Sequence, residues 1–186
     1  MILSLSNLLR RNAVSEPLDR IDFELIVALQ NNARLSNKEL AARVHLAPSS
    51  CLERVRRLER RGIFRGFHAE VDPHVFGIGL QALVFVRLIR HSREKVEAFR
   101  RYVLELPEAV ALFHVTGKFD FLVRVAVRDA DALRNLTMDA FTTRSEVSHL
   151  ETHLIFEHVR KPGFPLLVEV KGEAREPRRP AKRRRA

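Results

Sequence analysis

The part of the chain that most constrains the fold lies between residues 18 and 62, where three short helical patterns are joined by tight turns. Apolar residues recur at helical spacing from Asp19 to Gln30, from Ser36 to Val44 and from Pro48 to Arg61. A turn of about four residues separates the second helix from the third, which is typical of a helix-turn-helix. We therefore predict a three-helix, winged helix-turn-helix domain over residues 18–62.

Capping signals support these boundaries. Ser36 and Glu39 have the spacing of a capping box, in which each side chain satisfies a free backbone N–H of the other residue. Pro48 suits the first position of the third helix because its missing N–H would have no partner there. Gly62 suits the left-handed conformation that ends a helix.

The third helix is expected to bury an apolar stripe of Leu52, Val55 and Leu58 and to carry arginines and serines on its other faces. Arginine can pair with phosphates or form two hydrogen bonds to guanine, and serine can reach base edges in a major groove. This pattern predicts a recognition helix for double-stranded DNA. The alternative is a solvated helix whose charges are partly neutralised by nearby glutamates. The residues expected to contact DNA are Ser49, Ser50, Arg54, Arg56, Arg57 and Arg61.

The positive charge is unevenly distributed. Lys and Arg number 33 against 23 Asp and Glu, and the formal net charge of +10 favours a polyanionic partner. Eight of these cations, against two Glu, lie in residues 171–186, so residues 166–186 are expected to form a basic, disordered tail. Either this tail adds contacts to DNA phosphates or it only improves solubility.

Cysteine content and hydropathy predict a cytoplasmic, nucleoid-associated protein with no membrane partner. The single cysteine, Cys51, excludes an intramolecular disulfide and fits a reducing cytosol, where it is expected to pack in the recognition helix or border the DNA. No stretch approaches the roughly 20 apolar residues that span a bilayer. Residues 1–11 place their positive charges after the apolar stretch, which is the reverse of a secretory signal.

The second half alternates between strand and helix patterns. The order strand, helix, strand, strand, helix, strand is that of a ferredoxin-like βαββαβ domain, so the fold class is α+β. One face of its antiparallel sheet would be uncovered and partly apolar, which predicts a homodimer formed through the sheets. The expected strands are Leu80–Ile89, Val110–Thr116, Phe119–Val127 and Val147–Val159, and the expected helices are Ser92–Leu106 and Asp129–Arg144.

The predicted domain organisation follows from these patterns. Residues 1–17 form an N-terminal extension and residues 63–79 a linker strand or hinge. Residues 80–165 form the ferredoxin-like domain for effector binding and oligomerisation, ahead of the basic tail.

Three segments resemble the leucine-responsive regulatory protein and asparagine regulator (Lrp/AsnC, feast/famine) family of transcription factors. They are Leu18–Asp22, Cys51–Arg60 and Gly117–Phe121, which occur in order with the spacing kept from about Leu18 to Val159. The resemblance implies an N-terminal DNA-binding domain and a C-terminal domain that dimerises and regulates. It also implies dimers that assemble into octamers, and an amino-acid effector bound between subunits. No other cofactor and no metal is implied.

The resemblance also suggests effector residues. The turn of Gly117, Lys118, Phe119 and Asp120 matches the family's effector loop, in which glycine exposes backbone N–H groups to a carboxylate and Asp120 pairs with an α-ammonium group. Equally, Gly117 could permit a hairpin that Asp120 caps. Ala130, His153 and Leu154 match positions that line or border the family's site, although His153 could be an exposed strand residue.

One position departs from the family pattern. The residue before Pro48 is usually a capping serine in the family, and here it is Ala47. Losing such a cap costs on the order of 1 kcal/mol unless Ser49 or Ser50 compensates.

Two rival functions remain. Sirohaem decarboxylase subunits, which are enzymes that bind a tetrapyrrole, share this two-part fold. The histidines of this chain do not have metal-like spacing, however, and that chemistry does not require an arginine-rich recognition helix. We therefore expect no enzymatic activity. The other rival is an effector-independent nucleic-acid-binding protein, whose binding would be mostly lost on removal of residues 171–186. The histidines considered are His68, His74, His91, His114, His149, His153 and His158.

Overall fold

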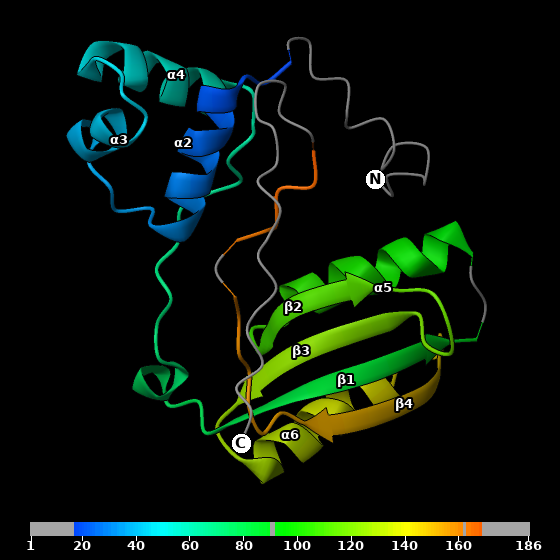
Figure 1. Ribbon diagram of the computed structural model, residues 1–186. Helices are drawn as coiled ribbons and strands as arrows, with labels where there is room; N and C mark the ends of the chain where they lie inside the picture. The colour runs from blue at the N-terminus through cyan, green and yellow to red at the C-terminus, as the bar shows by residue number, and fades with distance from the viewer. Residues whose placement is uncertain (1–16, 90–91, 162, 169–186) are drawn as a thin grey trace, which may run out of the picture. The chain divides into compact units, whose positions relative to one another are not determined.

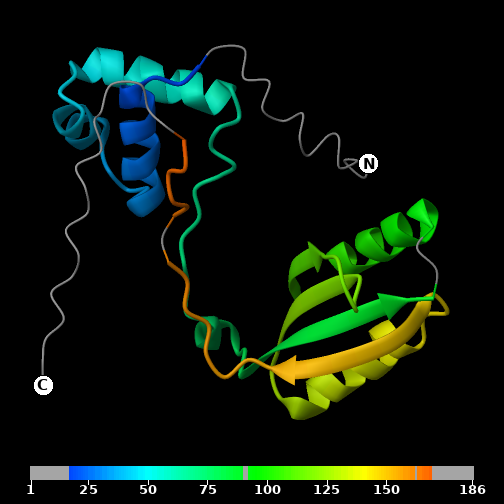
Figure 2. The same cartoon turned by 45° about the vertical axis from the view of Figure 1, so that its right-hand side comes forward.

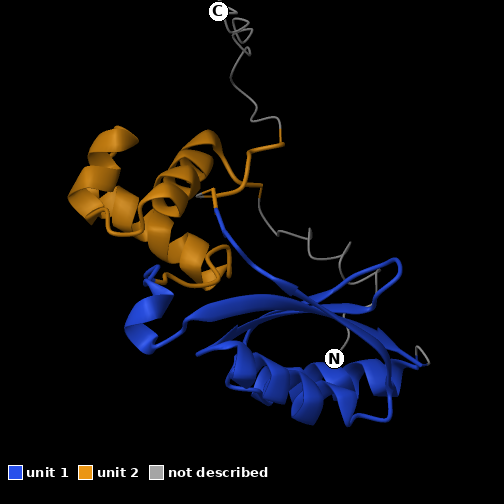
Figure 3. Cartoon of the chain, turned by 90° about the horizontal axis from the view of Figure 1, so that it is seen from below, with its two compact units in different colours: residues 1–12, 69–159 blue, residues 13–68, 160–186 orange. Residues whose placement is uncertain are grey.

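The chain forms two compact units in the computed structural model, which describes residues 17–89, 92–161 and 163–168 (Figure 3). One unit contains the described residues between 69 and 159, and the other contains the rest. By contacts within the chain, residues 160–161 and 163–165 group with the helical residues, whereas the sequence analysis assigned them to the sheet domain. Most of the expected N-terminal extension and the basic tail from residue 169 lie outside the described residues.

The helical unit, which contains residues 17–68, 160–161 and 163–168, is built from three helices, as the sequence predicted (Figure 1). They are α2 (Arg20–Asn31), α3 (Asn37–Arg43) and α4 (Pro48–Arg60). Ser36 and Glu39 form the expected capping box at the start of α3, and Gly62 has φ +67° just after α4. A second capping box, formed by Asp19 and Asp22, begins α2.

The buried stripe of α4 differs from the expected one. Cys51 and Leu58 are fully buried and Val55 packs against them, whereas Leu52 is 37% exposed. The stripe therefore begins one residue earlier than the apolar pattern suggested, because the cysteine serves as a small core residue. The side chains of this stripe pack against a core that includes Leu25, Leu29, Leu40 and Val44.

No strand forms over residues 63–72, where an alternating pattern suggested a linker strand or a hinge. A strand needs a neighbour for its backbone groups, and the described part of the chain offers none there. The next element is the short 3-10 helix η1 (Pro73–Phe76).

The sheet unit, which contains the described residues between 69 and 159, has a four-stranded antiparallel sheet in the order β2-β3-β1-β4. Its helices, α5 and α6, lie on one face of the sheet (Figure 3). This arrangement confirms the ferredoxin-like domain and the α+β class. The strands are β1 (Leu80–Leu88), β2 (Ala109–His114), β3 (Phe121–Val127) and β4 (Val147–Leu154), and the helices are α5 (Arg93–Glu105) and α6 (Ala130–Leu136).

Two elements end several residues before the predicted position. The last strand stops at Leu154 and does not reach Val159, although the Ile155 N–H still donates to the Gln81 carbonyl of β1 at 2.9 Å. The last helix changes at Thr137 into the π-helix η2 (Thr137–Thr142), a wider turn that helical periodicity does not reveal. Among the described residues, no helix is long and apolar enough to cross a membrane.

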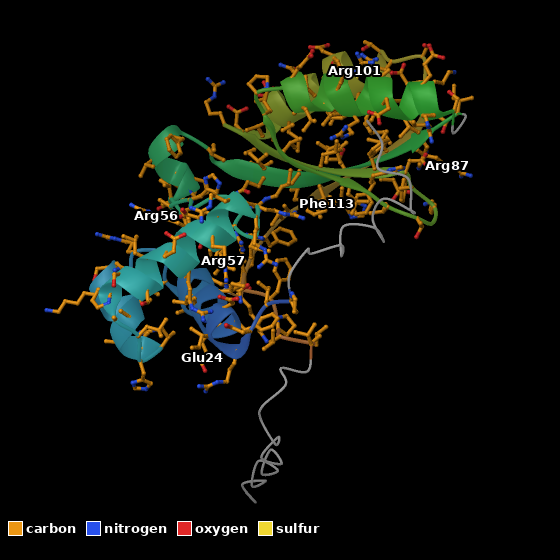
Figure 4. The ribbon with its side chains drawn as sticks, turned by 90° about the horizontal axis from the view of Figure 1, so that it is seen from above. Glu24, Arg56, Arg57, Arg87, Arg101 and Phe113 are labelled. Atoms are coloured by element: carbon orange, nitrogen blue, oxygen red, sulfur yellow. The ribbon has the colours of Figure 1, made fainter. Side chains whose placement is uncertain are left out.

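The two faces of the sheet differ in character. Alternate residues of β1, from Ala82 to Leu88, are buried against the helices, where Phe99, Phe121 and Phe141 fill the core. The opposite face carries apolar side chains that no helix of this unit covers. Phe113, which is 52% exposed, lies on that face, while Arg101 lies on the outer side of α5 (Figure 4).

Candidate DNA-binding helix and effector site

The recognition helix is fixed to α2 by a buried ionic cluster. The carboxylate of Asp22 is 1% exposed and accepts hydrogen bonds from Arg54 Nη1 at 2.9 Å and from Arg57 Nη2 at 2.7 and 2.8 Å. Arg54 Nη1 also donates to Asp19 Oδ2 at 2.6 Å. Two arginines of α4 are therefore held by the carboxylates at the start of α2.

The chemistry of this cluster favours a fixed helix over a mobile one. Burial of a carboxylate is costly unless charged donors surround it, and Asp22 has two guanidinium groups in contact. Partial burial raises the pKa of Asp19, but the Asp22 N–H and Arg54 outweigh it and hold that pKa below its ordinary value. The carboxylate of Asp19 is consequently charged at neutral pH.

The expected DNA-contacting residues fall into two groups. Ser49, Ser50 and Arg56 are exposed on α4, free of the ionic cluster. Arg57 points to the α2 side of its helix and Arg56 away from it (Figure 4). Arg54 and Arg57 are occupied by Asp22, and Arg61 is partly buried with interactions of its own. The sequence did not reveal the carboxylate partners, although Asp22 interrupts the apolar side of α2 and could have signalled a buried charge.

The first turn of α4 has no side-chain cap, as expected from the alanine before Pro48. Ala47 makes no side-chain hydrogen bond, and the structure shows no cap contributed by Ser49 or Ser50. The side chain of Asn37 donates to the Pro48 carbonyl at 2.7 Å, which ties α3 to the start of α4. The two helices of the motif are thereby held together without the usual cap.

The loop between β2 and β3 presents the expected Gly117–Asp120 segment. Gly117 has φ +116°, a backbone conformation that favours glycine. Asp120 is 6% exposed, and its Oδ2 accepts the Leu88 N–H at 2.7 Å. Its own N–H donates to the Val86 carbonyl at 2.9 Å. Asp120 therefore anchors the loop to the end of β1, which is a structural task in this state.

A polar and aromatic cluster lies beside this loop. Lys118 Nζ is 2.6 Å from Glu151 Oε1, and the rings of His149 and His153 are 3.1 and 3.5 Å from the same carboxylate. Phe119 packs against Phe85 with 5.3 Å between ring centroids. Hydrogen bonds from Lys118 and His149 lower the pKa of Glu151 to about 2.

A hollow of about 630 Å³ adjoins the loop, lined by Arg87, Leu88, Ile89, Lys118, Ser148 and His149. Its two cationic side chains provide positive charge for an anionic group. Of the other expected effector residues, His153 lies with this cluster, since its ring is 4.8 Å from that of Phe85. Leu154 pairs with Ala82 and Ala130 follows β3, so a single chain places both toward the other end of the sheet. Sequence reasoning missed Arg87 and Glu151, two charged residues that lie within strands β1 and β4.

The ionic contacts of Glu151 predict a pH dependence. Because the pKa of Glu151 is lowered from its ordinary value of 4.5 to about 2, its charge stabilises the folded state above about pH 4.5, and this contribution is lost as the pH falls toward 2. Glu151→Gln removes the titrating group. We expect the difference in unfolding midpoint between the unmodified chain and Glu151→Gln to shrink as the pH falls from about 4.5 toward 2. A difference that does not vary with pH would contradict the pairing.

Similarity to known proteins extends over both units. The family model described as the Lrp/AsnC ligand binding domain matches residues 81–163, and that described as winged helix-turn-helix DNA-binding matches residues 18–65. The HTH-type transcriptional regulator AldR of Mycolicibacterium smegmatis is 39% identical over 143 residues, which cover 77% of this chain and 84% of AldR. The chain belongs to the Lrp/AsnC family.

Other members of the Lrp/AsnC family agree with this assignment. The leucine-responsive regulatory protein of Escherichia coli is 38% identical over 144 residues, covering 77% of this chain and 88% of that protein. A crystal structure of a transcriptional regulator from Neisseria meningitidis in complex with L-Met has a TM-score of 0.74 at 32% identity, and covers 81% of this chain and 98% of the other. The chain is thus a DNA-binding transcriptional regulator with a ligand-binding domain.

Proposed function

We propose that α4 enters the major groove and reads sequence through Ser49, Ser50 and Arg56, while Arg54 and Arg57 hold the helix in place. The observation that supports this most directly is the ionic cluster on Asp22, which fixes one side of α4 and leaves Ser49, Ser50 and Arg56 exposed. A groove-binding helix gains affinity when its orientation is fixed before binding, because less order has to be imposed by the DNA.

We propose that two chains associate through the uncovered face of the sheet and that such dimers assemble further, up to octamers. Support comes from the apolar side chains on that face, including the half-exposed Phe113. Two recognition helices in one dimer would then occupy successive major grooves of an imperfect palindrome.

We propose that an amino acid binds near Gly117–Asp120 at a subunit interface. The positive charge of Arg87 and Lys118, which line the hollow, suits an α-carboxylate. Asp120 and Glu151, which accept hydrogen bonds from Leu88 and Lys118 of that lining, would supply carboxylates for an α-ammonium group. The neisserial relative was crystallised with L-Met, which supports this ligand class. Ala130 and Leu154 would join the site from a second chain. Binding that favours one assembly state shifts the population of states and hence promoter occupancy.

Screening the twenty amino acids by thermal shift tests the effector proposal. A ligand at about 100 times its Kd stabilises the native state by about 2.7 kcal/mol, so a cognate amino acid should raise the unfolding temperature by several degrees. We expect this shift for one or a few amino acids only. A chain that none of the twenty stabilises, at millimolar concentrations, would contradict an amino-acid effector and favour effector-independent regulation.

Arg56→Ala tests the DNA-reading face. The loss of one arginine contact to a base costs about 1–3 kcal/mol, so operator affinity should fall by about 5- to 150-fold while affinity for random DNA falls much less. Arg101→Ala is the matched control, because it removes the same charge from an exposed arginine of α5, which is far from α4 in sequence. Equal losses on operator and random DNA in Arg56→Ala would remove Arg56 from base reading.

A further inference from the structure

The segment after the sheet domain returns to α2 and binds it through a specific contact. Gln30 Nε2 donates to the Phe164 carbonyl at 3.0 Å, and the Phe164 N–H donates to Gln30 Oε1 at 2.9 Å. The side-chain amide thus satisfies both backbone groups of one residue, as a neighbouring strand would. Figure 2 shows this segment, in orange, beside α2.

The residue before Phe164 is a glycine, Gly163, which leaves room for the side chain of Gln30. Gly163 has φ +78°, and a Cβ added there would lie 2.3 Å from the side chain of Gln30. Any other residue at position 163 would therefore displace Gln30 or the segment. Close approach of the segment to α2 requires a glycine at this point.

An apolar contact follows two residues later. Leu166 lines a hollow of about 420 Å³ on the helical unit, together with Phe23, Val27, Ala28 and Val44. Phe164 itself is 89% exposed, so the attachment depends on its backbone and on Leu166, and not on the phenyl ring. Residues 163–168 thus meet α2 by one pair of hydrogen bonds and one leucine.

We propose that residues 163–168 are a docking arm that holds the start of the basic C-terminal segment on the DNA-binding unit, so that residues 171–186 contact DNA phosphates flanking the site read by α4. This inference rests on the proposed function of α4. The segment carries eight Lys and Arg against two Glu and begins three residues after Val168. Duplex DNA, with one phosphate charge for about every 1.7 Å of its axis, is the complementary partner.

Docking matters because it shortens the tether. Without the arm, the basic segment would be connected to the folded protein just after β4, where the Ile155 N–H donates to the Gln81 carbonyl at 2.9 Å and His158 lies 3.4 Å from Arg124. The local concentration of a tethered group falls roughly as the −3/2 power of tether length, so a tether of about 30 residues instead of about 18 lowers it by about two- to threefold. The arm therefore increases the contribution of the basic segment to DNA binding.

The test compares four full-length or truncated chains. They are the unmodified chain, Gln30→Ala, the chain ending at Val168, and Gln30→Ala in that shortened chain. Deletion of residues 169–186 should reduce the magnitude of the slope of log affinity against log salt by about 2–4, since each released counterion contributes about 0.9. Gln30→Ala should weaken operator binding about two- to threefold in the full chain and leave the shortened chain unchanged. Asn135→Ala is the matched control, because it removes an exposed side-chain amide from α6, which takes no part in the docking contact.

Hydrogen exchange separates docking from DNA binding. The Phe164 amide should be protected in the full chain without DNA, and Gln30→Ala should remove that protection. An unprotected Phe164 amide would overturn the docking arm. An unchanged salt slope after deletion would overturn the DNA contact and favour a solubilising segment. Tighter binding of the full chain to anionic vesicles than to DNA would also overturn the DNA contact. Failure of the proposed function looks different, because then no chain, with or without residues 169–186, would prefer operator to random DNA.

Discussion

Replacing Arg54 and Arg57 together with alanine should lower the free energy of unfolding of the helix-turn-helix unit by about 3–5 kcal/mol. Both guanidinium groups contact the buried carboxylate of Asp22, and removing them leaves that charge without a charged donor. Each single substitution leaves one arginine in place, so each should cost less than half of the double change. Chemical denaturation followed by circular dichroism measures the loss.

Arg56→Ala is the control for this experiment, because Arg56 lies between the two arginines in sequence and is exposed. It should leave the free energy of unfolding within about 0.5 kcal/mol of the unmodified chain, as surface substitutions do, while weakening DNA binding. A double variant as stable as the unmodified chain, with reduced base specificity, would show instead that Arg54 and Arg57 leave Asp22 and contact DNA.

Asp120→Asn should abolish the effector response and preserve the fold. Asparagine retains an oxygen that can accept the Leu88 N–H, so the loop keeps its anchor, but the negative charge that would pair with an α-ammonium group is lost. Losing one partner of a desolvated charge pair costs about 2 kcal/mol or more, which is at least about 30-fold in effector affinity. Titration calorimetry with the cognate amino acid measures this affinity.

Asp120→Ala distinguishes the structural task from the binding task. Alanine removes the acceptor of the Leu88 N–H as well, so it should cost about a further 1–3 kcal/mol of stability in the sheet unit. DNA binding without effector should persist in Asp120→Asn. If Asp120→Asn bound the effector as tightly as the unmodified chain, Asp120 would be only the anchor of its loop.

Much of the fold could be predicted because its signals are local. The Ser36–Glu39 capping box, Pro48 and Gly62 set helix ends through neighbouring backbone groups, and the structure has those ends. In the second half, the change from helical to alternating patterns gave the element order and so the ferredoxin-like class. Such features depend on residues within about one helical turn or one strand.

The features that could not be predicted depend on partners distant in the chain. Apolar periodicity shows which face of α4 is polar, but not that Arg57 turns toward Asp22, 35 residues earlier. The contact of Gln30 with Phe164 spans 134 residues and leaves no periodic trace. For the effector loop, the sequence located Gly117 and Asp120 but not the Leu88 N–H that Asp120 accepts.

The central claim is that two copies of α4, one from each chain of a dimer, read duplex DNA together. The sheet domains are the part that joins the two chains. The most direct test measures the affinity of the chain ending at Val168 for selected genomic fragments and for random DNA at moderate ionic strength, with its mass determined in the same solution. We expect a dimer or larger assembly that prefers particular fragments by about 1000-fold or more. A monomer that binds all fragments equally would contradict the claim.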